Sequence, residues 1–487
     1  MKILLINPNK WGRGITPIWI ASHAAILKKN GFVVELFDAT FFNRWHDNEI
    51  DYNTKNNQYK ETSYKNYVKF NDLDIFKELK DKIQEFRPDI IFWSAISSHI
   101  HGEGEYVNLQ YGYELIKEYK GNALLVAGGL QITADVEKIS KNYSLIDIFI
   151  GGESELILNE ISERYSDVQK NKKTLNNELK KIKGISFFNN GKLEINSKQN
   201  ILNNLDQIPH YDYSVFDDQV FYRAYNGKVL RAIDYEISRG CIYSCSYCVE
   251  TVIQSYYDFK ETTSSGAIKN AKSYLRNKNS KKIYEELKHY KEKFKIELIR
   301  FQDTNFLTID RKVLIELSEL ITKNPLGLKF YIETRPEGIN TKTIQLLKNL
   351  GVDGVGMGLE LSGEEFRSSK LNRIVDQNKI INAFNLLKEH NIGSTAYNII
   401  GLPDQDEQSI LDTIEFNKIL NPTNITVAFY TPYLGTPEQK KSFKKDYFLE
   451  YEENLDAQIR SVSKHSLIPV EKLEYYKSNF VKLVREG

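Results

Sequence analysis

The sequence is poor in sulfur, with three cysteines and two methionines among 487 residues. Three cysteines cannot all pair, so a disulfide framework is excluded as the basis of the fold. The chain also lacks an excess of either charge, since 66 Lys and Arg stand against 65 Asp and Glu. This balance gives no reason to expect nucleic acid or an anionic membrane surface as a main partner.

Long apolar runs are missing too. No stretch of about 18 apolar residues occurs, and the sequence therefore predicts no membrane span. Residues 1–8 begin with a short apolar stretch, but it lacks the length and the small-residue cleavage site of a secretory signal. Such a stretch is more typical of a first buried strand, so we expect a cytoplasmic protein.

Residues 1–155 alternate apolar strand-like runs with longer amphipathic stretches. Strands separated by helices need right-handed crossovers, and they predict a parallel, doubly wound sheet. The predicted strands are 2–7, 33–37, 90–94, 123–126 and 146–150, and the predicted helices include 17–29 and 107–119. Residues 41–72, rich in Asn, Tyr and Lys, are predicted to be an insertion or a long connection.

The alternation resumes over residues 231–437, after a bridging segment at 156–230 that contains a predicted hairpin at 184–195. Six strand–helix repeats predict a partial barrel with its active groups at the carboxyl ends of the strands. The predicted strands are 235–238, 297–301, 329–333, 355–359, 394–400 and 425–430, and the helices include 281–293, 311–322, 340–350 and 377–390. Residues 438–487 are expected to form a small helical region. The predicted fold class is therefore α/β: a Rossmann-like sheet followed by a partial (β/α)6 barrel.

All three cysteines fall in one triplet, Cys241-x-x-x-Cys245-x-x-Cys248. Three thiolates leave one iron of a 4Fe-4S cube without a protein ligand, so that a substrate or cofactor can bind there. Four cysteines would close the cube and suit plain electron transfer. The alternative is a zinc site completed by one of the eight histidines. Zinc sites usually have two separated ligand pairs, and the sequence shows no second pair.

Residues 238–248 resemble the signature of the radical S-adenosylmethionine superfamily. The resemblance implies that Cys241, Cys245 and Cys248 bind a 4Fe-4S cluster, whose open iron is chelated by the amino and carboxylate groups of S-adenosylmethionine. Reductive cleavage then releases methionine and a 5′-deoxyadenosyl radical. Tyr247, before the third cysteine, is implied to lie near the adenine. The cluster needs an electron donor such as flavodoxin or ferredoxin.

Further motifs of this superfamily follow at the ends of later strands, in the same order. The resemblance implies that Glu360, in a Gly-Leu-Glu-Leu-Ser-Gly segment, holds the amino or ribose groups of S-adenosylmethionine. It assigns Arg373 to the methionyl carboxylate and Gly401 to the cofactor pocket. Taken singly, each motif is also compatible with a solvated loop acid or a simple turn. The other matching segments are 301–306, 333–336 and 432–437.

Glycines and hydroxyl-bearing residues follow the predicted strands of the amino-terminal sheet. Doubly wound sheets bind ligands at the carboxyl ends of their strands, where glycines let a ligand approach and hydroxyls offer hydrogen bonds. No Gly-x-Gly-x-x-Gly follows the first strand, so a dinucleotide is not expected. From the residues alone, a nucleotide-binding sheet and a purely structural sheet both remain open alternatives. The segments concerned are 7–12, 94–99, 128–133 and 151–155.

Such a sheet before a radical S-adenosylmethionine barrel, joined through residues 205–209, is similar to the cobalamin-binding radical subfamily. Many cobalamin domains place a histidine ligand in Asp-x-His-x-x-Gly after the first strand, where this chain has Asn9. An amide is a poor substitute for imidazole, so we expect base-off cobalamin with no histidine on the cobalt. His99 and His101 are the alternative cobalt ligands. The resemblance implies that the cobalamin-binding residues are Asn9, Ser97, Gly128, Gly129, Thr133, Gly151 and Glu153.

The resemblance implies an enzyme, a class B methyltransferase that methylates an unactivated carbon, or a phosphinate phosphorus, of a small biosynthetic intermediate. The cofactors carry the difficult chemistry, so no protein acid or base is predicted. One alternative is an enzyme of the same subfamily that performs cyclisation, ring contraction or oxidation. Another is a cofactor-sensing protein without turnover. Methylthio transfer needs a second cluster, for which no cysteines remain.

Overall fold

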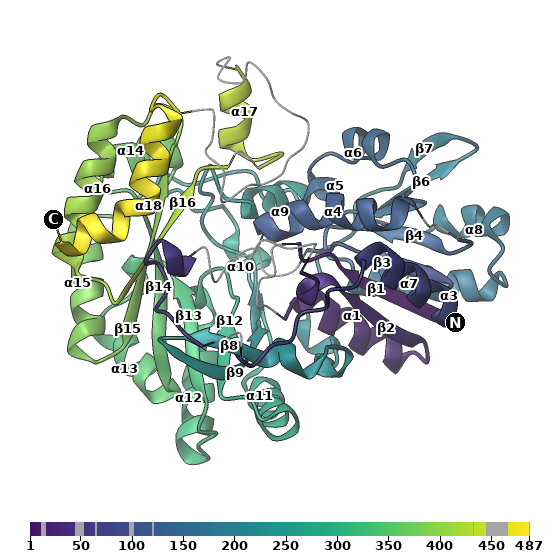
Figure 1. Ribbon diagram of the computed structural model, residues 1–487, viewed down its shortest axis with the longest axis horizontal. Helices are drawn as coiled ribbons and strands as arrows, with labels where there is room; N and C mark the ends of the chain where they lie inside the picture. Colours follow the sequence, from purple (N-terminus) through teal and green to yellow (C-terminus); the bar gives the residue numbers. More distant parts are fainter. Residues whose placement is uncertain are drawn as a thin grey trace. The chain divides into compact units, whose positions relative to one another are not determined.

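The computed structural model describes residues 1–10, 16–43, 53–63, 66–96, 102–118, 121–431, 433–444 and 466–486. The chain folds into two compact units (Figure 1). Unit 1 comprises Met1–Glu49, Tyr64–Tyr222 and Val252–Asp258, and unit 2 comprises Ile50–Ser63, Arg223–Thr251 and Phe259–Gly487. Each unit therefore contains a short segment that lies, in sequence, within the other.

The described residues of unit 1 form a seven-stranded sheet with the order β2-β1-β3-β4-β5-β6-β7. The first five strands pair in parallel, and β6 and β7 add an antiparallel hairpin. The strands are β1 (Lys2–Asn7), β2 (Val33–Asp38), β3 (Ile90–Trp93), β4 (Leu124–Ala127), β5 (Ile148–Ile150), β6 (Ile185–Asn189) and β7 (Lys192–Ile195). Parallel strands buried on both faces explain why β1, β3, β4 and β5 are almost wholly apolar.

This sheet confirms the predicted doubly wound architecture, and it extends beyond the predicted strands because the hairpin of the bridging segment joins its edge. The helices of unit 1 are α1 (Ile18–Lys29), α3 (Ile75–Phe86), α4 (Gly102–Lys117), α5 (Leu130–Ala134), α6 (Val136–Asn142), α7 (Glu155–Asp167) and α8 (Lys172–Leu179). The strand order reverses at β1, which lies between β2 and β3. Ligand-binding crevices of such sheets lie at this reversal.

Unit 2 contains a curled sheet, ordered β16-β15-β14-β13-β12-β9-β8 in the described residues. The strands from β9 to β16 pair in parallel and in chain order, with helices along their outer side (Figure 1). The strands are β8 (Tyr222–Tyr225), β9 (Lys228–Tyr235), β12 (Leu298–Phe301), β13 (Lys329–Thr334), β14 (Val352–Glu360), β15 (Gly393–Ile400) and β16 (Asn424–Phe429). The predicted partial barrel is thereby confirmed.

Several helices of unit 2 begin at side chains that accept hydrogen bonds from the first backbone amides. Such caps are worth about 1 kcal/mol each, and they act within one turn, so they mark the start of a helix in the sequence. The capping residues are Asn279, Asp310, Asn340, Asp376 and Asp406. The capped helices are α11 (Ser280–Phe294), α12 (Arg311–Lys323), α13 (Thr341–Leu350), α15 (Gln377–Glu389) and α16 (Glu407–Leu420). The other elements of unit 2 are α10 (Ala271–Tyr274), α14 (Glu364–Leu371), α17 (Pro437–Lys444), α18 (Val470–Glu486), β10 (Ser238–Arg239) and β11 (Arg276–Asn277). Helix α9 (Glu250–Tyr256) begins in unit 2, and its residues from Val252 on belong to unit 1.

The strand predicted over residues 235–238 is wrong. Strand β9 ends at Tyr235, and Ser238–Arg239 pair with Arg276–Asn277 in a separate two-stranded ribbon. The backbone amides of Ile237 and Ser238 donate to the Asp303 carboxylate instead of to a neighbouring strand. The chain therefore leaves the barrel earlier than its apolar pattern indicates.

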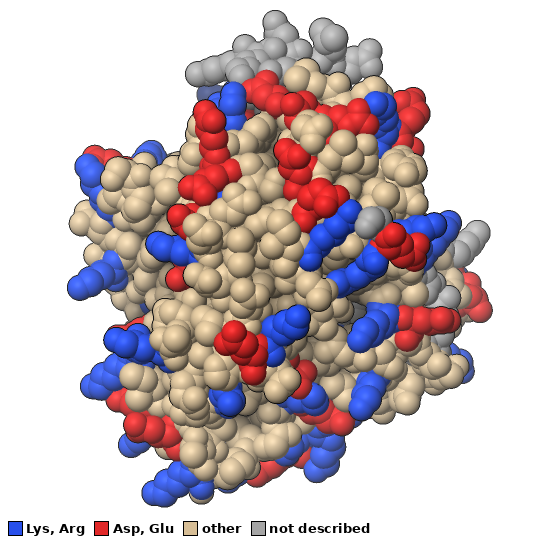
Figure 2. All heavy atoms as spheres, turned by 90° about the vertical axis from the view of Figure 1, so that its left-hand side faces the viewer, with Lys and Arg blue, Asp and Glu red and all other residues tan. Residues whose placement is uncertain are grey.

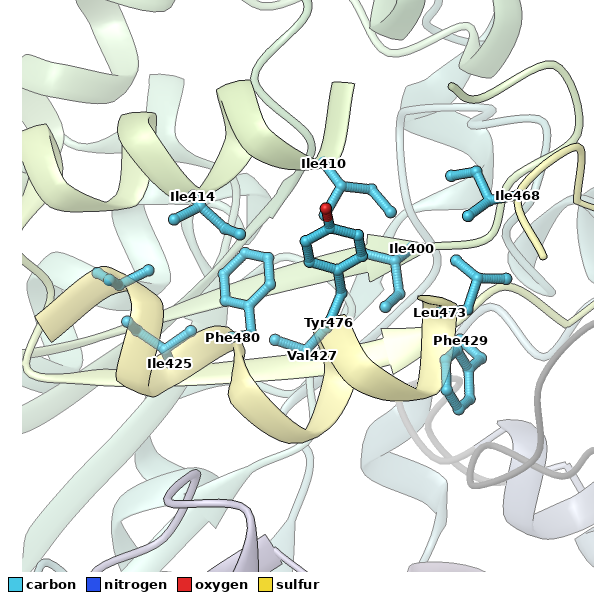
Figure 3. Close-up of a cluster of buried hydrophobic side chains, with 11 residues drawn as sticks. Ile400, Ile410, Ile414, Ile425, Val427, Phe429, Ile468, Leu473, Tyr476 and Phe480 are labelled. Carbon is cyan, nitrogen blue, oxygen red and sulfur yellow. The ribbon is translucent and has the colours of Figure 1, made fainter. Parts of the chain in front are cut away.

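Helix α18 covers the outside of the barrel next to the last two strands (Figure 3). Its buried side chains Leu473, Tyr476 and Phe480 recur at helical spacing and form one stripe. They pack on a shared cluster whose other members are Ile400, Ile410, Ile414, Ile425, Val427, Phe429, Ile468 and Val484. The carboxyl-terminal helix is thus part of the outer layer of unit 2.

A polar segment, residues 53–63, also belongs to unit 2 although it lies between β2 and α3 in sequence. Gln58 Oε1 accepts a hydrogen bond from the backbone amide of Val427, at 3.0 Å, on edge strand β16. Unpaired edge amides are costly when buried, and Gln58 satisfies this one. Part of the predicted insertion therefore protects the edge of the barrel sheet.

The described residues include no helix that is both long and apolar enough to cross a membrane. Acidic and basic side chains both occur across the face of the molecule drawn in Figure 2.

Glycines of β14 make room for tyrosines inside the barrel. A Cβ atom on Gly356 would lie 2.5 Å from Tyr397 Oη and 2.7 Å from Tyr331 Oη. We expect Gly356→Ala to destabilise unit 2 by about 1–3 kcal/mol, because overpacking forces these rings to move. The melting temperature should fall by roughly 2–10 °C in calorimetry.

The control for this prediction is Gly363→Ala, whose new Cβ would meet only side-chain atoms of Leu361 and Phe366, at 3.3 and 3.5 Å. Adding Tyr397→Phe to Gly356→Ala removes one clashing hydroxyl and should recover part of the loss. A Gly356→Ala protein as stable as the wild type would contradict the packing argument.

Candidate functional site

The three cysteines lie on one loop of unit 2 between β10 and α9. Cys241 and Cys245 are buried and Cys248 is half-buried. The Tyr243 amide donates to Cys241 Sγ at 3.4 Å. Burial raises the pKa of both Cys241 and Cys248, and the neighbouring Cys245 thiol raises both further. All three thiols therefore lie in the same part of the loop, close enough for Cys245 to affect the charge of the other two.

Two buried carboxylates hold this loop at its ends. Asp303, at the end of β12, accepts from the Ser238 amide at 2.6 Å, and burial raises its pKa to about 7. Glu250 accepts from the Cys241 amide at 3.1 Å and from Tyr274 Oη at 2.6 Å. Asp303 falls in a segment that the sequence motifs singled out, whereas nothing in the sequence assigned a role to Glu250.

Two guanidinium groups face the sulfur of Cys245. Nη1 of Arg335 lies 3.8 Å and Nη1 of Arg373 lies 4.0 Å from Cys245 Sγ. Arg335 also lies over the Tyr243 ring, 3.6 Å from its centroid, and forms an ion pair with Glu337. These two cations can offset the negative charge that the sulfur carries when it binds metal. Arg335 was missed by the sequence reasoning, although it stands in the matching segment 333–336.

The donor set fits an iron–sulfur cluster. In the part of the chain that the structure describes, no three Cys, His, Asp or Glu side chains are grouped to hold a single ion. A 4Fe-4S cube places each thiolate on a different iron, so its ligands need not meet at one point. Three thiols on one loop meet that requirement. A backbone amide donates to one of the sulfurs, and two cations lie beside another.

The structure brings Tyr247, Glu360 and Arg373 together. Tyr247 Oη donates to Glu360 Oε1 at 2.7 Å, and Arg373 Nη1 lies 3.8 Å from the same oxygen. Arg373 also donates to the carbonyl of Gly358. Burial lowers the pKa of Arg373, but Tyr247 and Glu360 outweigh this and raise it, so the group stays charged. Because Arg373 also faces Cys245, one cation connects the cysteine loop with this carboxylate.

Glu360 has an unusual backbone. Its φ is 65°, and the pairing of β14 with β15 skips one residue between Gly358 and Glu360. The Leu361 amide donates back to the Leu359 carbonyl at 2.9 Å, which closes a three-residue turn. A non-glycine residue in this region costs about 1–3 kcal/mol, and such bulges redirect side chains at functional sites.

Gly401 directly follows β15 and has a φ of 80°, a conformation that favours glycine. Its amide donates to Gln405 Oε1 at 2.8 Å, and a Cβ would lie 3.4 Å from Leu473 of α18. A tight turn and the approach of α18 thus account for this glycine. The next residue, Leu402, packs in an apolar cluster against which Tyr247 lies.

A buried polar cluster marks the carboxyl ends of β1 and β2 in unit 1. Asn9 Nδ2 donates to Thr40 Oγ1 at 2.9 Å, and Thr40 donates to Asp38 Oδ1 at 2.6 Å. Asn7 donates to the same carboxylate at 2.9 Å, and burial raises the pKa of Asp38. Asn9 is therefore part of a buried hydrogen-bond network at the point where the strand order reverses.

The glycine pair after β4 packs against β3. Gly129 has a φ of 102°, and a Cβ there would lie 2.6 Å from Ser94 Oγ. At Gly128 the nearest atom to a Cβ would be the Ser94 carbonyl oxygen, at 3.1 Å. Thr133 Oγ1 donates to the Gly129 carbonyl at 2.7 Å and accepts from the Gly152 amide at 2.9 Å, so it joins the two loops.

The glycine pair after β5 packs against residues that follow the cysteine loop in sequence. A Cβ on Gly151 would lie 3.0 Å from the Tyr256 ring, and one on Gly152 would lie 2.6 Å from Tyr257 Oη. The Glu153 amide donates to Tyr257 Oη at 3.0 Å. Substitutions at these glycines would disturb the loops with or without a ligand. Ser97, His99 and His101 lie outside the described residues.

Comparison with known proteins gives one family and several relatives. Residues 235–416 match the Radical SAM superfamily. The chain is 25% identical over 363 residues, 74% of its length and 71% of the relative's, to an uncharacterised methyltransferase of Pyrococcus horikoshii. It is 24% identical over 452 residues, 89% of its length and 68% of the relative's, to an anaerobic magnesium-protoporphyrin IX monomethyl ester cyclase of Rubrivivax gelatinosus.

A solved structure shares the fold along most of the chain. It is the radical S-adenosylmethionine methyltransferase TsrM of Kitasatospora setae, with cobalamin and a [4Fe-4S] cluster bound. The TM-score is 0.65 at 16% identity, and the match covers 92% of this chain and 79% of that one. The likeness shows a shared fold.

Proposed function

We propose that this chain, which belongs to the radical S-adenosylmethionine superfamily through residues 235–416, is a cobalamin-dependent methyltransferase acting on a small molecule. Its target would be an unactivated carbon or a phosphinate phosphorus. The observation that carries the proposal is the position of Arg373, which faces both Cys245 Sγ and Glu360 Oε1. The buried Arg373 cation thus lies beside both a proposed cluster ligand and the protein carboxylate that is proposed to bind S-adenosylmethionine.

In this proposal Cys241, Cys245 and Cys248 hold the cluster. Glu360 and Arg373 bind polar groups of S-adenosylmethionine, and Tyr247 orients Glu360 through its hydrogen bond. When bound, the cluster with S-adenosylmethionine supplies a 5′-deoxyadenosyl radical, and cobalamin supplies a transferable methyl group. A small protein such as flavodoxin or ferredoxin would reduce the cluster.

Cobalamin is proposed to bind unit 1 with its own base detached and no histidine on the cobalt. The Asn9 network at the carboxyl end of β1 supports this, because β1 marks the reversal of strand order. The fold likeness to a cobalamin-containing protein supports it as well. Ser97, Gly128, Gly129, Thr133, Gly151 and Glu153 complete the proposed contacts.

A second candidate is a related enzyme that rearranges or cyclises its substrate without methylation. The similarity to a cyclase over 89% of this chain favours it.

Transfer of an isotopic label from S-adenosylmethionine to the product distinguishes methyl transfer from the second candidate reaction. The full chain, reconstituted anaerobically with cluster and cobalamin, is supplied with S-adenosylmethionine labelled with deuterium in the methyl group. A labelled product supports methyl transfer, whereas 5′-deoxyadenosine with an unlabelled altered product supports the second candidate. Absence of 5′-deoxyadenosine under every condition would contradict both.

The electron paramagnetic resonance spectrum of the cobalt(II) form tests the cobalt ligand. This spectrum should lack the splitting that a coordinating nitrogen produces. A splitting that is lost in His99→Ala or His101→Ala would overturn the ligand-free assignment.

The position of Arg335 leads to a prediction about the reduction potential of the cluster. Its cation lies 3.8 Å from Cys245 Sγ, so removing it should make reduction of the cluster harder. We expect Arg335→Met to lower the midpoint potential by roughly 50–100 mV, an effect of about 10- to 50-fold on the reduction equilibrium. Arg335→Lys, which keeps the charge, is the control and should shift the potential less. The potential is measured by redox titration with electron paramagnetic resonance, and equal potentials in all three proteins would contradict the prediction.

A further inference from the structure

Arg300 lies on β12 with its side chain inside the barrel. The next residue, Phe301, packs outward against Tyr235 and Phe330, with ring centroids 5.9 and 5.2 Å apart. Successive side chains of a strand point to opposite faces, so Arg300 points inward. Its guanidinium lies over the Tyr331 ring, 5.3 Å from the centroid.

The guanidinium of Arg300 makes no hydrogen bond or ion pair with any described residue. The nearby acid Asp234 already accepts from Arg223 Nη2, at 2.6 Å, and from Gln302 Nε2. Burial lowers the pKa of Arg300, but Asp234 and Tyr331 outweigh this and raise it, so the group stays charged. A charged group with five donors is costly to enclose unless something accepts its hydrogen bonds.

The inner face of the barrel remains reachable. Five inward-facing side chains on β12, β13, β15 and β16 are only half-buried, although Tyr331 and Thr395 on the same face are buried, and the outward-facing residues between them are buried under the helices. The half-buried residues are Arg300, Glu333, Tyr397, Ile399 and Thr426. The inner face is therefore partly exposed at these five positions, Arg300 among them.

Arg300 lies about one strand segment away from the end of the barrel at which the cofactors are proposed to bind. Arg300 is in register with Tyr331, and Arg335 follows four residues later at the carboxyl end of β13. Four residues of strand span about 13 Å. A molecule bound at Arg300 by one end can therefore extend towards Cys245 and Glu360.

We propose that Arg300 binds an anionic group of the substrate, a carboxylate or a phosphate, inside the barrel. The planar fork of an arginine suits two oxygens of either group. The Tyr331 and Tyr397 hydroxyls, 2.7 Å apart, lie beside it as further partners. The inference rests on the proposed function, because it assumes that the substrate reacts in this barrel.

A first experiment tests anion binding without turnover. Crystals of the full chain are soaked in sodium bromide, and anomalous scattering locates the halide. We expect bromide at the Arg300 guanidinium of the wild type and none there in Arg300→Gln. Bromide at other arginines but not at Arg300 would overturn the proposal.

A second experiment uses turnover. Cell-extract metabolites are separated into anionic, neutral and cationic fractions and supplied, with methyl-labelled S-adenosylmethionine, to the reconstituted enzyme. The label should enter an anion. At about pH 2 a product held by its carboxylate loses its charge and a phosphate monoester keeps one, which distinguishes the two groups.

For that substrate, Arg300→Gln should raise KM about 10- to 100-fold and leave substrate-free formation of 5′-deoxyadenosine unchanged. The control is Arg231→Gln, since Arg231 lies on β9 and donates to the Phe294 carbonyl of α11, outside the barrel. Label in a neutral or cationic product would overturn the Arg300 proposal and keep methyl transfer. Bromide at Arg300 without any labelled product would refute methyl transfer and keep the anion site.

Discussion

Replacing Cys241, Cys245 or Cys248 with alanine is expected to abolish cleavage of S-adenosylmethionine. Each thiolate would hold a different iron, so the loss of one leaves the cube open at a second iron and unstable. The reconstituted wild type should contain about four irons per chain, and each variant should contain far fewer. Unit 1 should stay folded, because it contains none of the three cysteines.

The measurements are iron content, the absorbance of the cluster and the amount of 5′-deoxyadenosine formed with dithionite. Ser244→Ala is the matched control, since it changes a residue of the same loop and leaves the three thiols in place. A triple alanine variant that still forms 5′-deoxyadenosine would refute the assignment of the loop.

Glu360→Gln is expected to weaken S-adenosylmethionine binding about 10- to 100-fold, because a charge-assisted hydrogen bond becomes a neutral one. The amide has the same shape, so the turn at Leu359–Leu361 is kept. Alanine would be a poorer choice, since it leaves the buried Arg373 cation without its carboxylate and threatens the fold.

Binding is measured by equilibrium dialysis with the reconstituted, unreduced protein. Glu365→Gln, an exposed acid on the neighbouring helix α14, is the control and should bind normally. Tyr247→Phe should cost less than Glu360→Gln, because it removes a neutral donor. Equal affinity of Glu360→Gln and the wild type would assign Glu360 to a structural role in the turn.

Much of the fold is determined locally. Alternation of apolar runs, helix caps such as Asn340 and Asp376, and the hairpin turn all act within a few residues, so the sequence predicts them well. The cysteine triplet is local too, and its spacing alone indicates a shared metal site. Tyr247 and Glu360, 113 residues apart, were named from a family resemblance, and the structure shows that they form a hydrogen bond.

The rest depends on which distant segments meet. The sequence indicates that glycines follow β4 and β5, but only the fold shows that those after β5 make room for Tyr256 and Tyr257. An apolar pattern continues past Tyr235, yet the Asp303 carboxylate ends the strand there. In the sequence Gln58 lies in a predicted insertion or long connection, yet it protects an edge strand 369 residues away.

By itself, then, the sequence determined the alternation of strands and helices, the two sheet architectures and the cysteine loop, because period, caps and spacing are short-range properties. Only the tertiary structure decided that Arg335 faces a sulfur and that Arg300 lies inside the barrel, where no described residue accepts a hydrogen bond from its guanidinium. An arginine has the same local preferences whether it is solvated, paired or aimed at a ligand. Its surroundings come from strands and helices that are remote in sequence, and these are assembled only when the barrel closes.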